Sequence, residues 1–421
     1  MWKAECCMNN LVYIYYVIFY LSLTYGLFFF VTGLWGFARN GRKQIKEHAP
    51  KTRFAVLIAA RNEEKVITNL IDSLKKQNYP KDMYTIYVIA NNCTDNTAGV
   101  AKKAGAKLLP CEGVVKTKGD VLKQTYARFL DNDEVDAFAI FDADNIVDPN
   151  FLKEMNNALC SGFNVAEGNR DSKNVADNWL SGSYSLFYYM QNFFFNKARM
   201  NMGLSAAING TGFVVKKSVI IKNGFDPVTL TEDSEFTAQC SINNERIAYV
   251  EKAITYDEHP VRFKDSWNQR KRWSKGTLQC LRTYGGRLIK NIFKNSDMTS
   301  LDMLMMFIAP IVQVASLFII VMLAGFKYMG IQLMDLFSYI FASGLLFFVV
   351  TYLIGVLTNV FIFKFNKQSV KEVLSSVFLF ALFIVTWIPI NVVCLVKKDI
   401  TWKPISHDRN VDMDKLLNRN N

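Results

Sequence analysis

Two aspartates, Asp142 and Asp144, follow the apolar run 137–141 and are separated by a single alanine. The run predicts a buried strand of a mostly parallel sheet, and ligands bind at the carboxyl ends of such strands. Side chains two residues apart on a strand share a face, so the carboxylates would repel unless a cation lies between them. Their oxygens suit Mg²⁺ or Mn²⁺, which would hold a diphosphate. The alternative is a strand end followed by a turn, because Asp is also a turn residue.

Three further polar motifs stand in order along the chain: Asn62-Glu63-Glu64, Thr231-Glu232-Asp233 and Gln269-Arg270-Lys271-Arg272-Trp273. Two arginines can bind a diphosphate bidentately, and a tryptophan offers a flat apolar face to a sugar ring. Each motif has a structural alternative. The second could simply cap a helix, and the third could be an Arg/Trp belt beside membrane helices.

Alternating strands and helices are predicted to position these residues. Apolar runs at 54–60 and 84–90 predict two strands, and the 3.6-residue pattern at 63–77 predicts a helix between them. Thr94 or Asp95 would cap a helix to about Lys103, and a third helix at 118–130 leads to the strand at 137–141. This order predicts an α/β fold with a parallel, doubly wound sheet. Further along the chain, an aromatic-rich segment at 176–200 is either a core helix or an interfacial one. It is followed by a short strand at 213–215 and a helix at 234–242.

Composition points to a membrane protein. The 421 residues are 51% hydrophobic, with 33 Phe and 18 Tyr. The net charge of +12 includes ten Lys/Arg against one acidic residue in the interval 262–294, directly before a long apolar segment. Juxtamembrane charge explains this better than nucleic-acid binding, so membrane lipids and no nucleic acid are expected as partners. The eight Cys contain no C-x-x-C pair and the three His are far apart, which argues against a zinc site or disulfide framework and favours a reducing compartment.

Four apolar segments are long enough to span a bilayer: 11–38, about 301–326, 336–363 and 373–396. Basic residues after the first segment place the amino terminus outside and the next domain in the cytoplasm. Three later spans would then put the tail outside, although Lys397-Lys398 and the basic residues beyond prefer the inside. One segment is therefore re-entrant or interfacial. The predicted organisation is an anchor at 1–38, a catalytic domain at 50–260, amphipathic interfacial helices at 261–299, membrane helices at 300–397 and a basic tail at 398–421.

The four motifs in this order resemble those of the membrane-embedded family-two glycosyltransferases, the cellulose, chitin and hyaluronan synthases and their exopolysaccharide-forming relatives. The resemblance extends from about Phe54 into the last membrane segments. It implies a GT-A (Rossmann-like) cytoplasmic domain with transmembrane helices in the plasma membrane. The implied reaction is inverting transfer from a UDP-sugar, with Mg²⁺ or Mn²⁺, to a growing glycan of an extracellular polysaccharide, with partner subunits of an export system possible.

The resemblance also assigns roles. Asp142 lies on the nucleotide side, Asp144 binds the metal, and Asp233 is the general base, with Glu232 beside it in the catalytic motif. The predicted helix start at Asp233 would hold the pKa of its carboxyl low. Donor or acceptor contacts are implied for these residues: Asn62, Glu63, Asn91, Asp95, Lys118, Thr211, Gly212, Gln269, Arg270, Arg272 and Trp273. Relatives usually carry an aspartate where Asn91 and Asn92 stand. An asparagine can still form hydrogen bonds to the nucleotide, but it brings no charge.

Two rival functions stay open. A non-processive enzyme could glycosylate a lipid or lipid-linked acceptor, because the Gln-Arg-x-Arg-Trp element also occurs in lipid glycosyltransferases. A non-catalytic membrane subunit could bind sugar nucleotide or glycan, which Asn91 motivates. Retention of Asp142, Asp144 and Asp233 argues against the second rival, because a protein that only binds needs no base.

Overall fold

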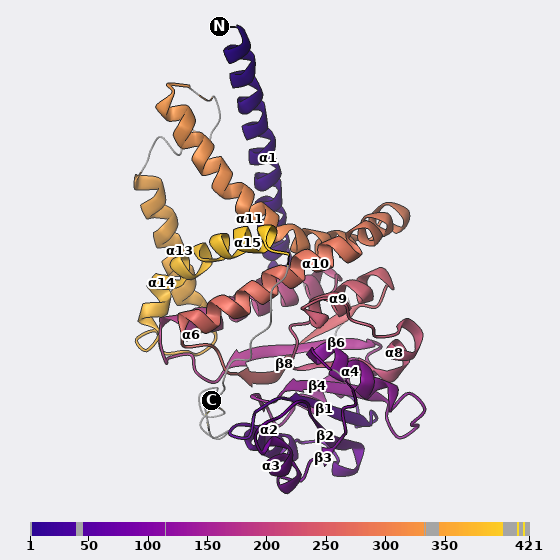
Figure 1. Cartoon of the computed structure of the whole chain (residues 1–421). Coiled ribbons are helices and arrows are strands. Elements are labelled where there is room, and N and C mark those ends of the chain that lie inside the picture. Colours follow the sequence, from indigo (N-terminus) through magenta and orange to yellow (C-terminus); the bar gives the residue numbers. More distant parts are fainter. Residues whose placement is uncertain are drawn as a thin grey trace.

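A computed structural model describes residues 2–38, 45–113, 115–331, 333, 345–398, 411 and 416. Its centre is a sheet of eight strands in the order β3-β2-β1-β4-β7-β6-β8-β5 (Figure 1). The strands are β1 Phe54–Ala60, β2 Tyr84–Ala90, β3 Lys107–Leu108, β4 Ala137–Asp142, β5 Ile146–Val147, β6 Val165–Ser172, β7 Phe213–Lys216 and β8 Ile247–Asp257. The predicted strands at 54–60 and 84–90 are confirmed without any shift of their ends.

Helices cover both faces of the sheet, which explains why its central strands are continuously apolar. Val56 and Ile58 of β1 face one cluster, built with α2 Ile67–Lys75, α3 Thr97–Lys103 and α5 Phe151–Cys160. Ala55 and Leu57 face the opposite cluster, built with α4 Lys118–Ala127, α8 Lys217–Asn223 and α9 Glu232–Ile242. A short 3₁₀ turn, η1 Lys81–Met83, precedes β2. The predicted α/β fold is therefore confirmed.

The sheet is mixed: the strands of its first half are parallel, and in its second half β6 and β8 are parallel to each other. β3, β2, β1 and β4 are parallel, whereas β7 is antiparallel to both β4 and β6, and β5 is antiparallel to β8. The expected parallel, doubly wound sheet is confirmed for β3-β2-β1-β4. β7 interrupts it because β7 begins where β4 ends: the Gly212 amide donates to the Ile140 carbonyl at 2.9 Å. This reversal brings the turn at 209–212 to the carboxyl end of β4.

The aromatic-rich segment is a buried helix, as the first of its two interpretations predicted. It comprises α6 Trp179–Met190, a π-helical stretch η2 Gln191–Lys197 and α7 Ala198–Met202. Leu180, Tyr184 and Tyr188 are at most 4% exposed. The segment lies between the sheet and the C-terminal helices (Figure 1).

Long helices flank the catalytic sheet in sequence. They comprise α1 Trp2–Ala38, α10 Phe263–Asn295, α11 Met298–Tyr328, α13 Leu345–Phe365, α14 Leu374–Val385 and α15 Trp387–Val396. Four stretches are apolar and long enough to cross a membrane: α1, α11, α13 and the joined α14–α15. The region predicted as several interfacial helices is the single helix α10. Arg39, Arg42, Trp402 and most of the basic tail lie outside the described residues.

Candidate active site

The carboxyl end of β4 meets the first turn of α4. Thr117 caps α4 through a reciprocal capping box with Asp120, which places Lys118 at the first helical position. The Lys118 Nζ pairs with Asp142 Oδ1, the last residue of β4, and donates to the Gly210 carbonyl at 2.6 Å. Burial lowers the pKa of Lys118, but the charges of Asp142, Glu232 and Asp233 outweigh it, so the pKa is raised. Lys118 therefore stays protonated among three carboxyl groups.

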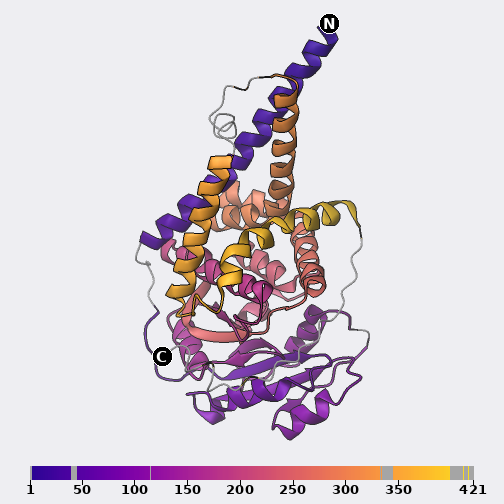
Figure 2. The same cartoon turned by 90° about the vertical axis from the view of Figure 1, so that its left-hand side faces the viewer.

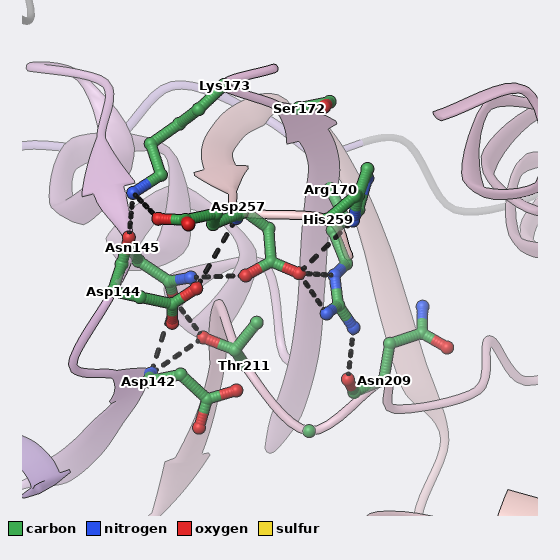
Figure 3. A network of polar contacts seen from close by, with 12 residues as sticks. Asp142, Asp144, Asn145, Arg170, Ser172, Lys173, Asn209, Thr211, Asp257 and His259 are labelled. Atoms are coloured by element: carbon green, nitrogen blue, oxygen red, sulfur yellow. Dashed lines mark hydrogen bonds and ion pairs between the residues drawn. The ribbon is translucent and has the colours of Figure 1, made fainter. Parts of the chain in front are cut away.

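A buried polar network fixes the turn that follows Asp142 (Figure 3). The Asp142 amide donates to Asn145 Oδ1 at 3.2 Å and to Thr211 Oγ1 at 3.0 Å. Asn145 Nδ2 donates to Asp257 Oδ1 at 3.0 Å, and Arg170 Nε donates to Asp257 Oδ2 at 3.0 Å. Burial alone would raise the pKa of Asp257, but the Arg170 guanidinium holds it well below the usual range. Strands β4, β6 and β8 are thus joined behind the Asp142 carboxylate, which points away from the network.

Asp144 lies at the other side of this turn and is 5% exposed. Its Oδ2 accepts from the Glu258 amide at 3.4 Å. The Lys173 ammonium donates to the Asp144 carbonyl oxygen and lies 3.5 Å from Glu258 Oε2. Lys173 and Glu258, both nearly buried, therefore hold the backbone and side chain of Asp144 in place.

The residues at this turn fit a divalent ion of the Mg²⁺ or Mn²⁺ type. Asp142 and Asp144 supply hard carboxylate oxygens, the ligands that these ions prefer. Among the described residues no cluster of three or more His, Cys, Asp or Glu side chains could form a cage. In proteins Mg²⁺ is usually bound by one or two carboxylates, and phosphate oxygens of the substrate complete its coordination shell. The donor set therefore fits a metal that is bound together with a diphosphate.

Glu232 and Asp233 begin α9 and face Lys118 and Arg272. Gly210 has φ +88°, and a Cβ built on it would lie 3.1 Å from Asp233 Oδ2, so only glycine lets the turn at 209–212 approach this carboxyl so closely. Lys118 contacts the carbonyl of the same glycine. Gly210 thereby brings Asp233 next to the Lys118–Asp142 pair.

The expected low pKa of Asp233 is wrong. Burial raises the pKa of Asp233, and the Ser234 amide together with Arg272 and Lys118 opposes that increase only in part. Burial also raises the pKa of Glu232 to about 7, with the charge of Asp233 adding to the effect. Desolvation exceeds the helix-dipole effect here because both carboxyls are partly buried by residues from other segments rather than fully exposed at a helix end.

The carboxyl ends of β1 and β2 carry the other predicted nucleotide contacts. Asn62 has φ +60°, and its Oδ1 accepts from the Thr94 amide at 2.7 Å. The Glu63 amide donates to Thr97 Oγ1 at 2.8 Å, and Asp95 Oδ1 accepts from the Thr97 amide at 3.0 Å. These contacts tie the two loops together. Asn91 follows β2 at the same edge, where its amide donates to the Ala60 carbonyl at 2.9 Å.

The Gln-Arg-x-Arg-Trp residues on α10 divide between two environments. Arg272 Nη1 donates to the Leu230 carbonyl at 3.1 Å and lies close enough to Glu232 and Asp233 to lower their pKa values. Arg270 is fully buried, and its Nη1 donates to Phe383 O at 3.0 Å and Thr386 Oγ1 at 2.7 Å. The structure thus brings Arg272 to the carboxylates, whereas Arg270, expected beside it, contacts α14. Gln269 precedes Arg270 on the same helix.

Trp273 contacts an aromatic cluster. Its ring lies 6.0 Å from the Tyr184 ring and 6.3 Å from the Trp387 ring, centroid to centroid. His259 stacks against Tyr184 at 5.5 Å, and burial lowers the pKa of His259 to about 3. The cluster connects the network at Asp257 with the C-terminal helices.

Arg170, Asp257, Asn145 and Lys173 were not predicted from the sequence. Asn145 directly follows the Asp-x-Asp pair, and Asp257 precedes the acidic residue Glu258, so proximity in sequence could have indicated both. Arg170 and Glu167 are charged residues within a buried strand, which was a usable signal. Their pairing partners could not be read from the strand itself.

The chain is similar in sequence to known glycosyltransferases. The family model described as glycosyltransferase like family 2 matches residues 50–276. The probable glycosyltransferase YdaM of Bacillus subtilis is 26% identical over 288 residues, 64% of this chain and 66% of the relative. A beta-monoglucosyldiacylglycerol synthase of Nostoc is 26% identical over 289 residues, 65% of this chain and 59% of the relative. The chain spans less than two thirds of the length of these curated relatives.

A solved structure shares the fold. The mannosyltransferase PcManGT from Pyrobaculum calidifontis, in complex with GDP-Man and Mn²⁺, aligns with a TM-score of 0.60 and 15% identity. The alignment covers 92% of this chain and all of the other. It therefore extends beyond the catalytic domain, since residues 50–276 make up only about half of the chain.

Proposed function

The chain belongs to glycosyltransferase-like family 2, and we propose that it moves a sugar from a UDP-sugar, with inversion, to a lipid or lipid-linked acceptor at the membrane. The observation that carries this proposal is the meeting of Asp142, Lys118 and Asp233 at Gly210: Lys118 pairs with Asp142 and contacts the Gly210 carbonyl, and Asp233 lies beside the Cα of the same glycine. In this proposal the donor-binding residues and the base act on one anomeric carbon.

Each residue has a chemical role in this proposal. The Asp233 carboxylate accepts the proton of an acceptor hydroxyl as its oxygen bonds to the anomeric carbon, and the bond from that carbon to the diphosphate oxygen breaks. A pKa raised by burial makes Asp233 a stronger base than an exposed aspartate. Arg272 and Lys118 supply positive charge beside the departing UDP. Mg²⁺ or Mn²⁺, when held by Asp144 and Asp142, supplies further positive charge at the diphosphate.

Two considerations favour a lipid acceptor. A relative that matches 65% of this chain is named a beta-monoglucosyldiacylglycerol synthase. The described part of the chain also contains only four candidate spans, which are few for a polysaccharide pore. The second candidate is synthesis of an extracellular polysaccharide, which the Gln-Arg-x-Arg-Trp motif favours. In either version the catalytic domain faces the cytoplasm, where nucleotide sugars are available.

The test is product analysis with purified protein in lipid nanodiscs. Single UDP-sugars would be supplied with Mn²⁺, Mg²⁺ or EDTA, and with nanodiscs that contain or lack diacylglycerol. The proposal predicts metal-dependent UDP release and one glycosylated lipid. A polymer of many sugars would support the second candidate. UDP-sugar binding without any transfer, also in native membranes, would support the non-catalytic subunit.

Variants make the test specific. Asp233→Asn should reduce kcat by roughly 100-fold or more, the usual contribution of a general base, while donor binding persists. Asp144→Ala should abolish the response to metal. Asp226→Asn is a matched control, because Asp226 pairs with Lys123 on the surface away from the three carboxyl groups. Full activity of Asp233→Asn would contradict the assignment of the base.

A further inference from the structure

Two described residues beyond the last helix, Val411 and Leu416, lie against the catalytic domain. Leu416 is 1% exposed and packs against Ile146 of β5 and Tyr256 of β8, with Val411 beside them. A segment that contacts the sheet must lie on the same side of the membrane as the sheet. The chain between Asp257, where β8 ends, and Val411 therefore crosses the bilayer an even number of times.

Among the described residues of that interval there are three candidate spans: α11, α13 and the joined α14–α15. Three crossings would place Leu416 on the side opposite Tyr256, which their contact forbids. One of the three apolar segments therefore does not cross. All three segments are apolar, so composition does not show which one fails to cross. The contacts of each segment with the rest of the protein must show it.

α14 packs on a helix of the catalytic domain. A Cβ built on Gly182 of α6 would lie 2.8 Å from the Ser376 Cβ of α14, so the two backbones approach closely. Further along, the Tyr184 and Phe383 rings lie 5.0 Å apart. Since α6 also packs on the sheet through strand β6, α14 lies at the level of the catalytic domain rather than beyond it (Figure 1).

α15 runs beside the basic helix α10. The helical segment breaks at Thr386, where the Arg270 guanidinium reaches its hydroxyl and the Phe383 carbonyl. Lys275 Nζ donates to the Cys394 carbonyl at 3.1 Å, and Cys394 Sγ contacts the Lys271 carbonyl at 3.4 Å. Charged side chains avoid the centre of a bilayer, so a segment bound along its length by Arg270 and Lys275 is placed near the membrane surface.

The other candidates extend beyond the catalytic domain, although the C-terminal end of α13 also contacts α6, where the Phe363 and Tyr189 rings lie 6.3 Å apart. α1, α11 and α13 project away from the sheet, whereas α10 and α15 run across the base of that projection (Figures 1 and 2). Tyr328, at the far end of α11, is 94% exposed. The outward residues of α14–α15 are also exposed and apolar, including Leu382 and Val385. These exposed apolar residues adjoin the apolar surface of the spanning helices, so lipid at the acyl-chain boundary of one leaflet covers them.

We propose that α14–α15 is a bent interfacial element that rests in the leaflet facing the catalytic domain, and that the chain crosses the membrane three times, through α1, α11 and α13. Lys397 and Lys398 then lie at the surface of that leaflet, which accounts for their charge. The stacked pair Trp273 and Trp387 joins this element to the Gln-Arg-x-Arg-Trp motif. This inference is independent of the donor and of the acceptor.

Cysteine accessibility tests the number of crossings on the full chain. The background replaces with serine the cysteines that are not buried and those near the amino terminus: Cys6, Cys7, Cys93, Cys111 and Cys160. Single probes are then placed at Lys103 in the catalytic domain, Tyr328, Lys371 and the chain end Asn421. A membrane-impermeant maleimide should label Lys371→Cys and Asn421→Cys on the same side as Lys103→Cys, and Tyr328→Cys on the other. Labelling of Asn421→Cys on the Tyr328 side would overturn the proposal.

Depth in the bilayer is the second measurement, with a matched pair of spin-labelled cysteines. Val385 and Ile354 are each close to the middle of their apolar segments and are 56% and 59% exposed. Collision with dissolved oxygen and with a water-soluble nickel chelate should show Val385→Cys near the headgroups and Ile354→Cys near the bilayer centre. Equal, central depths for both probes would establish α14–α15 as a span and refute the interfacial assignment.

Discussion

Lys118 and Asp142 form an ion pair between the first residue of α4 and the last residue of β4. The same ammonium group contacts the carbonyl of Gly210, and Asp233 lies beside the Cα of that glycine. One lysine therefore connects the donor-binding edge of the sheet with the candidate base. Its positive charge lowers the pKa values of Glu232 and Asp233, which burial alone would raise further.

Replacing Lys118 by methionine should reduce kcat/KM by roughly 10- to 150-fold, the equivalent of about 1.5–3 kcal/mol for a hydrogen bond to a charged group. The acid limb of the pH profile should also move to higher pH, because the remaining carboxyls lose a stabilising positive charge. Lys123→Met is the control, since Lys123 stands on the same helix but pairs with Asp226 at the surface. Equal losses in both variants would contradict a specific role for Lys118.

Glu232→Gln should leave the acid limb of the kcat/KM profile in place. Asp233 must be deprotonated to accept a proton, so activity is lost as pH falls through its raised pKa. Burial raises the pKa of Glu232 to about 7 and the charge of Asp233 adds to the effect, so Glu232 is the neutral member of the pair while Asp233 titrates. Glutamine keeps both the size and the neutral state of that side chain. The wild-type limb should lie above the ordinary aspartate range of about 3.9. A limb that moves to lower pH in Glu232→Gln would show that Glu232 is charged while Asp233 titrates.

Asp257→Asn should destabilise the catalytic domain by about 3–5 kcal/mol, because it leaves the buried Arg170 guanidinium without its charged partner. Chemical unfolding monitored by tryptophan fluorescence in detergent measures the change. Asp226→Asn, an exposed aspartate in an ion pair, should change stability by less than about 1 kcal/mol. Similar unfolding midpoints for the two variants would argue against the Arg170–Asp257 pair as a stabilising contact.

Arg272→Lys should weaken donor binding, whereas Arg270→Lys should lower the stability of the protein. Arg272 lies beside Glu232 and Asp233, so its replacement should raise the KM for the UDP-sugar with little change in thermal stability. Arg270 binds the Phe383 carbonyl and the Thr386 hydroxyl, so its replacement should lower the unfolding temperature. Steady-state kinetics and thermal unfolding on the same preparations separate the two effects. A donor KM that rises only in Arg270→Lys would reverse this assignment.

The sequence by itself predicted the elements whose signals are local. The apolar runs of β1 and β2, and the carboxylates that end β4, depend on neighbouring residues along one strand, because side-chain alternation and strand ends are short-range properties. Order along the chain placed Asp142, Asp144 and Asp233 in one motif set. Length and composition also identified four candidate spans, since the thickness of a bilayer fixes the length of an apolar helix.

The tertiary structure decided which distant groups meet. The antiparallel entry of β7, the pairing of Arg170 with Asp257 and the separation of Arg270 from Arg272 all depend on contacts between segments far apart in sequence. The raised pKa of Asp233 has the same origin, because burial by distant residues outweighs the dipole of its own helix. Hydrophobicity made α14–α15 resemble a span, whereas the contact of Leu416 with Tyr256 limits the number of crossings. Burial and charge act through space, so a pattern read along the chain cannot specify them.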